Sequence, residues 1–200
     1  MLDTIDKSMR KELLDQRRTM PAAEHEEATQ TIRGRLSSLL PALRINAALA
    51  YTAFRGEPDV LPVLLAPELK IFLPRITGPG TMEFCHVTEP QDLTTNALGI
   101  LEPKVNCPVE EAPRKGLQYA IIIPCVAASR QGIRLGYGGG YYDRFLPSWP
   151  KAAKIGITFD QFFCREIPSE GHDIALDYVI TQTEIWDVDR ASAFVAHINP

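Results

Sequence analysis

The sequence predicts an α/β fold: one domain over residues 1–200, with a mostly parallel, Rossmann-like sheet and helices on both faces. Two patterns support this prediction. Segments of helical periodicity alternate with short apolar segments along the chain. The segment 119–126 is apolar and rich in β-branched residues, which is typical of a strand covered on both faces. A chain of 200 residues can also bury a large core without disulfides.

Two helices are expected at the start of the chain. Over residues 4–18, apolar side chains recur every four positions, and Asp3 or Thr4 is the candidate N-cap. Over residues 21–39, apolar side chains again recur at helical spacing, and Pro21 suits the first turn. Both segments therefore have one apolar face to pack against a sheet.

Short apolar segments predict the strands that follow. The expected strands cover residues 47–54, 70–74, 81–87, 119–126, 154–159 and 178–181. A turn at 77–80 joins the second strand to the third, and short helices are expected at 59–65 and 141–146. Four prolines make residues 88–116 rich in turns. The order of these elements is that of an α/β sheet.

Composition narrows the function classes. The net charge is −4 and the pI is near 5.6, so we expect no nucleic-acid partner. The polar N-terminus has no signal-peptide core, and no apolar run is long enough to span a bilayer. The four cysteines lack zinc-site spacing and are expected to be free thiols, with Cys125 in the core. The predicted location is the cytoplasm.

The segment 131–146, QGIRLGYGGGYYDRFL, carries the strongest chemical signal. It follows the most apolar strand and leads into a helix, the place where α/β proteins bind ligands. Its glycines allow backbone amides to converge on an anion, and Arg134 and Arg144 flank them. The segment matches neither the P-loop nor the dinucleotide-binding pattern. A phosphate-binding loop and a flexible turn both remain open.

Two aspartates near this loop are candidate metal ligands. Asp143 follows the glycines directly, and Mg²⁺ prefers one or two carboxylates together with phosphate oxygens. Asp143 is equally consistent with an acidic residue in the first turn of a helix. Asp173 lies in a second polar loop, 170–173, and is either a second ligand or a turn residue. His172 is expected to be a surface group or to act behind a ligand.

Two further features have both a binding and a structural interpretation. Lys7, Arg10 and Arg17 share one face of the first helix, where they either reach an anionic ligand or form a solvated, mixed-charge face. Glu57 stands in a Gly-Glu-Pro turn after an apolar strand. That position suits ligand binding in this architecture, although a single turn glutamate usually has no such role.

The run RLGYGGGYYDRFL closely resembles the signature of the 5-formyltetrahydrofolate cyclo-ligase family. The first helix with Arg10 is also similar to the family. Further similar blocks follow in order at 53–60, 73–75, 82–84, 96–103, 123–124, 155–157, 167–168 and 172–173. The resemblance implies an ATP- and Mg²⁺-dependent cyclisation of 5-formyltetrahydrofolate to 5,10-methenyltetrahydrofolate, with release of ADP and phosphate.

The resemblance also implies roles for individual residues. ATP would be bound by Lys7, Arg10, Arg134, Gly136, Tyr137, Gly138, Gly139, Gly140, Tyr141 and Asp143. Arg134 would be catalytic, neutralising charge on the transferred phosphoryl group. The folate site would comprise Glu57, Met82, Tyr141 and Tyr142, with Glu57 on the pterin ring. Asp143 and Asp173 would hold Mg²⁺.

The chain departs from the family pattern at several positions. Asp6 stands where the family usually has Lys, with Lys7 one step away. The segment 125–129 lacks the usual Phe and Asp, ending in Ala128 and Ser129, and Leu98 replaces a frequent aromatic residue. The phosphate and metal residues are intact. Two alternatives are another small-molecule phosphoryl-transfer enzyme and a non-catalytic folate- or nucleotide-binding protein. A monomer is expected, with ATP and 5-formyltetrahydrofolate as its small-molecule partners.

Overall fold

The computed structural model describes residues 2–65, 68–163, 166–168 and 173–194, with side chains from residue 7 onward. The helices are α1 (Leu2–Arg18), α2 (Ala22–Ala42), α3 (Leu61–Leu64) and α4 (Tyr141–Phe145), with 3-10 turns η1 (Pro90–Asp92), η2 (Leu146–Ser148) and η3 (Asp160–Phe162). Within these ranges, no helix has both the length and the apolarity to cross a membrane.

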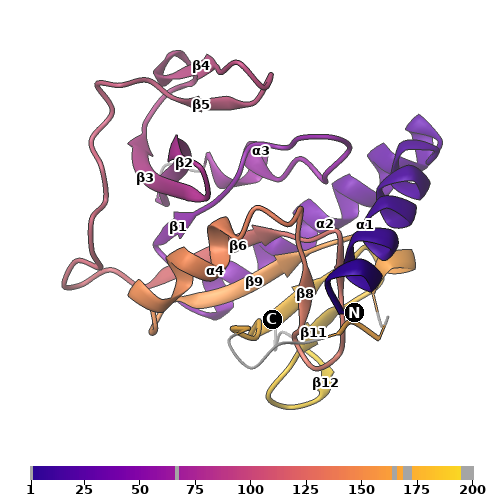
Figure 1. The fold of residues 1–200 in the computed structure, drawn as a ribbon. Helices are drawn as coiled ribbons and strands as arrows, with labels where there is room; N and C mark the ends of the chain where they lie inside the picture. Colours follow the sequence, from indigo (N-terminus) through magenta and orange to yellow (C-terminus); the bar gives the residue numbers. More distant parts are fainter. Residues whose placement is uncertain (1, 66–67, 164–165, 169–172, 195–200) are drawn as a thin grey trace.

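An eight-stranded sheet forms the centre of the molecule (Figure 1). Its order is β12 (Ser192–Ala193), β11 (Ile185–Asp187), β10 (Tyr178–Ile180), β9 (Ala153–Ile157), β6 (Tyr119–Pro124), β1 (Ala47–Leu49), β2 (Lys70–Gly78) and β3 (Thr81–Val87). The five strands from β10 to β2 are parallel to one another. Strands β3, β11 and β12 add antiparallel edges. The predicted α/β fold with a mostly parallel sheet is confirmed.

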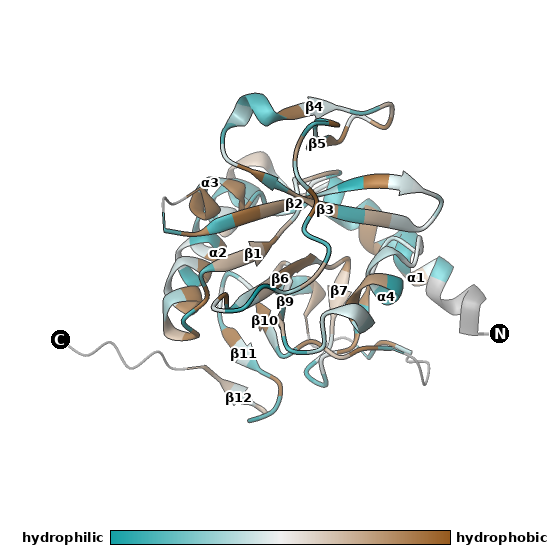
Figure 2. Cartoon of the chain, turned by 90° about the vertical axis from the view of Figure 1, so that its left-hand side faces the viewer, coloured by the Kyte–Doolittle hydropathy of each residue, from teal (hydrophilic) through white to brown (hydrophobic). Residues whose placement is uncertain are grey.

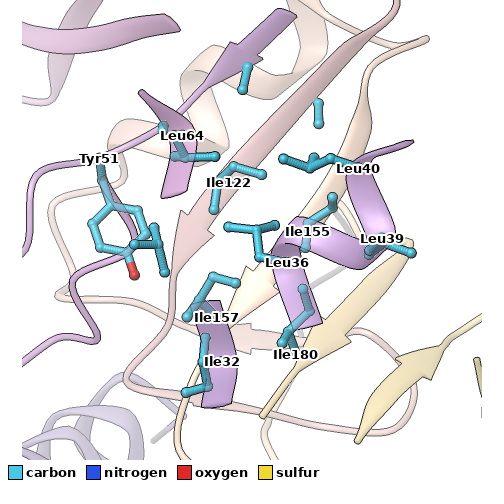
Figure 3. Close-up of a cluster of buried hydrophobic side chains, with 14 of the residues drawn as sticks. Ile32, Leu36, Leu39, Leu40, Tyr51, Leu64, Ile122, Ile155, Ile157 and Ile180 are labelled. Atoms are coloured by element: carbon cyan, nitrogen blue, oxygen red, sulfur yellow. The ribbon is translucent and has the colours of Figure 1, made fainter. Parts of the chain in front are cut away.

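One face of the sheet is covered by α2 (Figure 3). Ile32 and Leu36 from this helix point at Ile155 and Ile157 of β9, and all four side chains are buried. Their i, i+4 spacing is the helical pattern visible in the sequence. Burial of such side chains contributes roughly 1.5–3 kcal/mol each, so this layer is a main source of stability.

The other face of the sheet is covered by the short helix α4, by η2 and by Trp149. Ile121 and Ile123 of β6 point to this side and pack with Trp149, which follows α4 and η2 and is 1% exposed. Adjacent residues Ala120 and Ile122 belong to the first face. Alternate side chains of β6 are thus buried on both sides, as its apolar sequence predicts. Figure 2 shows β1 and β6 in the interior of the molecule.

Two small sheets lie outside the main one. Strands β4 (Leu93–Thr95) and β5 (Leu101–Pro103) form an antiparallel pair beyond β2 and β3, at the top of Figures 1 and 2. Strands β7 (Ala127–Ala128) and β8 (Arg134–Leu135) form the other pair and lead into the glycine-rich loop. The sequence prediction missed both pairs, as well as β11 and β12.

Strand β1 is shorter than expected, because it ends at Leu49 and not near residue 54. The chain then leaves the sheet and is held by side-chain hydrogen bonds. The Tyr51 hydroxyl donates to the Pro58 carbonyl at 2.7 Å, and the Thr52 hydroxyl donates to the Leu101 carbonyl at 2.6 Å. The loop after β1 therefore places the Gly-Glu-Pro turn beyond the carboxyl end of the parallel strands.

Candidate active site

A cavity of about 550 Å³ lies at the carboxyl ends of β1 and β6. It is bounded by the turn after β1, the β2–β3 hairpin, the β4–β5 turn, the glycine-rich loop with α4, and residues 167, 168 and 173. Segments far apart in the sequence therefore meet at one place. This is the edge at which α/β sheets bind ligands.

The glycine-rich loop lines one wall of this cavity, and Arg10 holds it in place. The Arg10 Nε donates to the Gly136 carbonyl at 2.7 Å, and its guanidinium lies against Gly138. Gly138 has φ +85° and Gly140 has φ +64°, values that other residues adopt only with strain. The first helix is thus tied to the loop, with the Arg10 charge at the wall of the cavity.

Arg144, a second candidate phosphate ligand, has a different position. Its Nε donates to the Gly80 carbonyl at 2.7 Å, and Nη2 donates to the Gly139 carbonyl. Gly80 is the tight turn between β2 and β3, with φ +69°, and a Cβ there would overlap the Arg144 guanidinium. Arg144 therefore fastens the hairpin to the glycine-rich loop and does not line the cavity.

Arg134 and Asp143 form an ion pair across the mouth of the loop. The Arg134 side chain is 7% exposed, and it donates to Asp143 Oδ1 and to the Ile174 carbonyl. Arg134 comes from β8 and Asp143 from α4, so the pair spans the two ends of the glycine-rich segment. Both side chains line the cavity. The guanidinium is therefore positioned to neutralise an anion in the loop.

Asp143 and Asp173 line the same cavity, next to the glycine-rich loop. No group of three or more metal-ligating side chains occurs among the described residues. The donor set thus fits Mg²⁺ that shares its shell with phosphate oxygens, and it does not form an all-protein cage. Residues 170–172, including His172, lie outside the described part of the chain.

Glu57 is buried beside the cavity, with 5% of its surface exposed. Its Oε2 accepts a hydrogen bond from the Phe54 backbone amide at 2.8 Å. Burial raises the pKa of Glu57 to about 7, although that hydrogen bond, the Arg17 charge and the Tyr137 hydroxyl each lower it. A carboxyl group that titrates near neutral pH in a cavity is a strong candidate for ligand binding.

Apolar and aromatic groups line the rest of the cavity. The predicted residues Met82, Tyr141 and Tyr142 all belong to this wall. Burial also raises the pKa of Tyr142 well above its usual value. The sequence prediction did not assign Ile76, Ile100, Tyr51, Phe54, Arg55 and Glu102 to the site, although they line it as well. A wall of this kind suits a flat, partly apolar ligand.

Every residue predicted for the site lines the cavity except Lys7. Lys7 is exposed on α1 and stays outside the cavity wall. Leu98, which stands at a family aromatic position, lines the cavity and is 65% exposed. Of the two interpretations of Arg17, the solvated face is wrong, because the Arg17 side chain is buried. Its spacing from Arg10 and Leu13, at i, i+3 and i+7, is the signal that places it on the inner face of α1.

The comparisons with known proteins agree with one another. The model of the 5-formyltetrahydrofolate cyclo-ligase family matches residues 3–182. The 5-formyltetrahydrofolate cyclo-ligase of Escherichia coli (strain K12) is 29% identical over 178 residues, covering 86% of this chain and 97% of that protein. The Mycolicibacterium smegmatis enzyme of that name is 32% identical over 182 residues, covering 86% and 91%.

A solved structure shares the fold along the whole chain. The NMR structure of Aquifex aeolicus 5,10-methenyltetrahydrofolate synthetase has a TM-score of 0.80 and 26% identity, and the match covers 98% of each chain. The similarity in sequence thus extends to the arrangement of the sheet that carries the cavity. The chain belongs to the 5-formyltetrahydrofolate cyclo-ligase family.

Proposed function

We propose that this protein converts 5-formyltetrahydrofolate to 5,10-methenyltetrahydrofolate with consumption of ATP. One observation supports this most directly. Glu57 and Met82, the residues proposed for folate, line the same cavity as Arg134, Asp143 and the glycine-rich loop. A phosphoryl donor and a folate acceptor therefore have room to meet.

The glycine-rich loop binds the ATP phosphates in this proposal. Residues 136–140 line the cavity, where loop amides can bind phosphate oxygens, and Arg10 adds a positive charge from α1. Tyr137 and Tyr141 complete this wall. Lys7 remains a proposed ATP contact through the solvent-exposed face of α1.

The folate ring binds in the same cavity, next to the glycine-rich loop. Glu57 accepts hydrogen bonds from the amino-pyrimidine edge of the pterin, because an ionised carboxylate offers only acceptors. Tyr141, Tyr142 and Met82 pack against the flat ring system. This arrangement directs the formyl group toward the glycine-rich loop.

The reaction then needs little covalent chemistry from the protein. The formyl oxygen attacks the γ-phosphorus of ATP, the bond to ADP breaks, and an imine-like phosphate ester forms. The neighbouring secondary amine of the same folate attacks the formyl carbon and loses its proton. Inorganic phosphate leaves with the formyl oxygen. Because both reacting groups belong to one molecule, the protein contributes mainly positioning and charge neutralisation.

Arg134 is the proposed catalytic residue. Its guanidinium is paired with Asp143 in the structure, at the edge of the phosphate loop. When a phosphoryl group moves, negative charge develops on its oxygens, and a bidentate guanidinium stabilises it. Asp143 in turn orients Arg134 across the cavity.

Asp143 and Asp173 are the proposed Mg²⁺ ligands, together with phosphate oxygens. When bound, Mg²⁺ supplies positive charge to the phosphate oxygens. The two carboxylates contribute by holding this charge at the mouth of the glycine-rich loop. We further propose a single domain over residues 1–200 and a monomer in the cytoplasm that binds no nucleic acid.

An absorbance assay for the methenyl product tests this function. Purified protein is mixed with 5-formyltetrahydrofolate, Mg²⁺ and ATP, and a matched sample lacks ATP. We expect product only with ATP, in equal amount to the ADP released. Absence of product, in a folded sample that binds both ligands separately, would show that the protein sequesters folate and does not convert it.

A further inference from the structure

Arg17 of α1 is a buried cation that the proposed reaction does not use. It is 2% exposed. Its Nη2 donates to the carbonyls of Cys125 at 2.6 Å and Val126 at 3.3 Å, and Nη1 donates to the Tyr137 hydroxyl at 3.3 Å. The buried Nε has no hydrogen-bond partner. Among the described residues, no carboxylate lies within ion-pair distance of it. Burying an unpaired charge is energetically costly. A function in the neighbouring site would explain why Arg17 is buried there.

Three segments that contribute residues to the cavity wall meet at the Arg17 side chain. Cys125 and Val126 directly follow Ile123 and Pro124, the end of β6, and these two residues line the cavity. Tyr137 belongs to the glycine-rich loop. The third segment is the turn that carries Glu57, because a Cβ on Gly56 would lie 3.4 Å from Arg17 Cγ. Arg17 therefore joins the folate side of the cavity to the phosphate side.

The pKa of Glu57 depends on the groups that surround its carboxyl, including Arg17 and Tyr137. Burial raises the pKa of the Glu57 carboxyl, and both the Arg17 charge and the Tyr137 hydroxyl lower it. The other titratable groups facing Glu57 have raised pKa values and are neutral near pH 7: Tyr51, Cys125, Tyr137 and Tyr142. Arg55 lies in the same turn, and His25 of α2 contacts the Gly56 carbonyl at 3.0 Å.

We infer that Arg17 is a positioning residue of the folate site: its buried charge favours the ionised form of Glu57, and its hydrogen bond fixes Tyr137 beside that carboxylate. The inference rests on the proposed role of Glu57 in pterin binding. Protonated Glu57 would present a donor to the N–H groups of an amino-pyrimidine edge and lose part of the match. Arg17 thus sets the pH range over which the site accepts its substrate.

Calorimetric titration with 5-formyltetrahydrofolate between pH 5.5 and 9 tests this inference. ATP is left out, because a terminal phosphate titrates in the same range. In the unmodified protein, affinity falls below pH about 7. Arg17→Gln moves this fall upward by about one pH unit, which raises Kd at pH 7 about fivefold. Arg17→Lys keeps the charge and restores the original position.

Two matched variants control for a general loss of positive charge and for titration of a nearby histidine. Arg18→Gln removes the same charge from the neighbouring residue, whose side chain is 72% exposed, and leaves the curve unchanged. His25→Gln also leaves it unchanged, which excludes the histidine as the titrating group. In the full reaction, Arg17→Gln raises KM for folate more than it lowers kcat, because Arg17 acts on binding.

Two results of the titrations would contradict the role of Arg17. An unchanged curve in Arg17→Gln, or an unchanged curve in Glu57→Gln, overturns the inference. If Arg17→Gln does not fold, Tyr137→Phe removes a single oxygen atom from the same network; an upward shift supports the inference and no shift contradicts it. If the unmodified protein binds no 5-formyltetrahydrofolate at any pH, the proposed function itself fails.

Discussion

Burial of the Glu57 carboxyl makes its protonation part of the stability of the protein. Its pKa is about 7 in the folded state against 4.5 as the ordinary value, so folding favours the protonated form. This stabilisation is complete below pH 4.5 and is lost as pH rises through 7. The pKa difference corresponds to about 3 kcal/mol.

Glu57→Gln should therefore remove this dependence on pH. Between pH 5 and pH 8 the variant should gain about 2.5 kcal/mol in free energy of unfolding relative to the unmodified protein, measured in urea. Glu89→Gln, at an exposed position outside the cavity, is the control. A stability difference between Glu57→Gln and the unmodified protein that is the same at both pH values would contradict the burial argument.

Arg134 acts on a charge that exists mainly during transfer of the phosphoryl group. Arg134→Ala should lower kcat about a hundredfold or more while Kd for 5-formyltetrahydrofolate changes less than threefold. Steady-state kinetics and calorimetry measure the two quantities, and Arg18→Ala on the exposed face of α1 serves as the control. An equal loss of folate affinity would show that Arg134 binds substrate and has no special part in the chemical step.

Asp143 is proposed to hold Mg²⁺ next to the loop. Asp143→Asn should raise the Mg²⁺ concentration for half-maximal phosphate release about tenfold, because one anionic ligand becomes neutral. The measurement is a Mg²⁺ titration at fixed ATP. Asp15→Asn, an exposed change on α1, should leave the requirement as it is. An unaltered Mg²⁺ requirement in Asp143→Asn would remove Asp143 from the metal site.

The conformation of the glycine-rich loop requires glycine at the positions with positive φ. At Gly140, φ is +64° and a Cβ would lie 2.7 Å from the Arg144 guanidinium. Gly140→Ala should cost about 1–2 kcal/mol in stability and weaken ATP binding. Gly136→Ala, in the same loop with nothing within 4 Å of the added carbon, should leave stability unchanged. Thermal unfolding and KM for ATP test both; equal effects would contradict the conformational argument.

Sequence patterns predict long elements better than short ones. Helix α2 and strand β6 have enough residues for their periodicity to be recognised, and both were predicted within a few positions. Strands β4, β5, β11 and β12 contain two or three residues each. Their pairing is set by contacts with distant segments, which a local pattern does not contain. Strand β1 also ends earlier than its apolar run predicts, and the hydroxyls of Tyr51 and Thr52 then donate to the carbonyls of Pro58 and Leu101.

For the whole molecule, topology brings the site together. The glycine-rich loop and Glu57 are 80 residues apart, and their proximity follows from β1 and β6 being adjacent and parallel. The family resemblance identified both, and the cavity contains both. For Arg17 the sequence left two interpretations open, because the charged neighbours on α1 also suggest a solvated face. The hydrogen bond from Arg17 to the Cys125 carbonyl shows that its side chain points inward.

The destination of the formyl oxygen shows whether ATP phosphorylates the folate in this cavity. The reaction is run with 5-formyltetrahydrofolate carrying ¹⁸O in the formyl group, ATP and Mg²⁺, and the released phosphate is examined by mass spectrometry. We predict one ¹⁸O atom in each phosphate, in equal amount to the methenyl product. Phosphate without the label, or product formed without ATP, would contradict phosphoryl transfer to the formyl oxygen in this cavity.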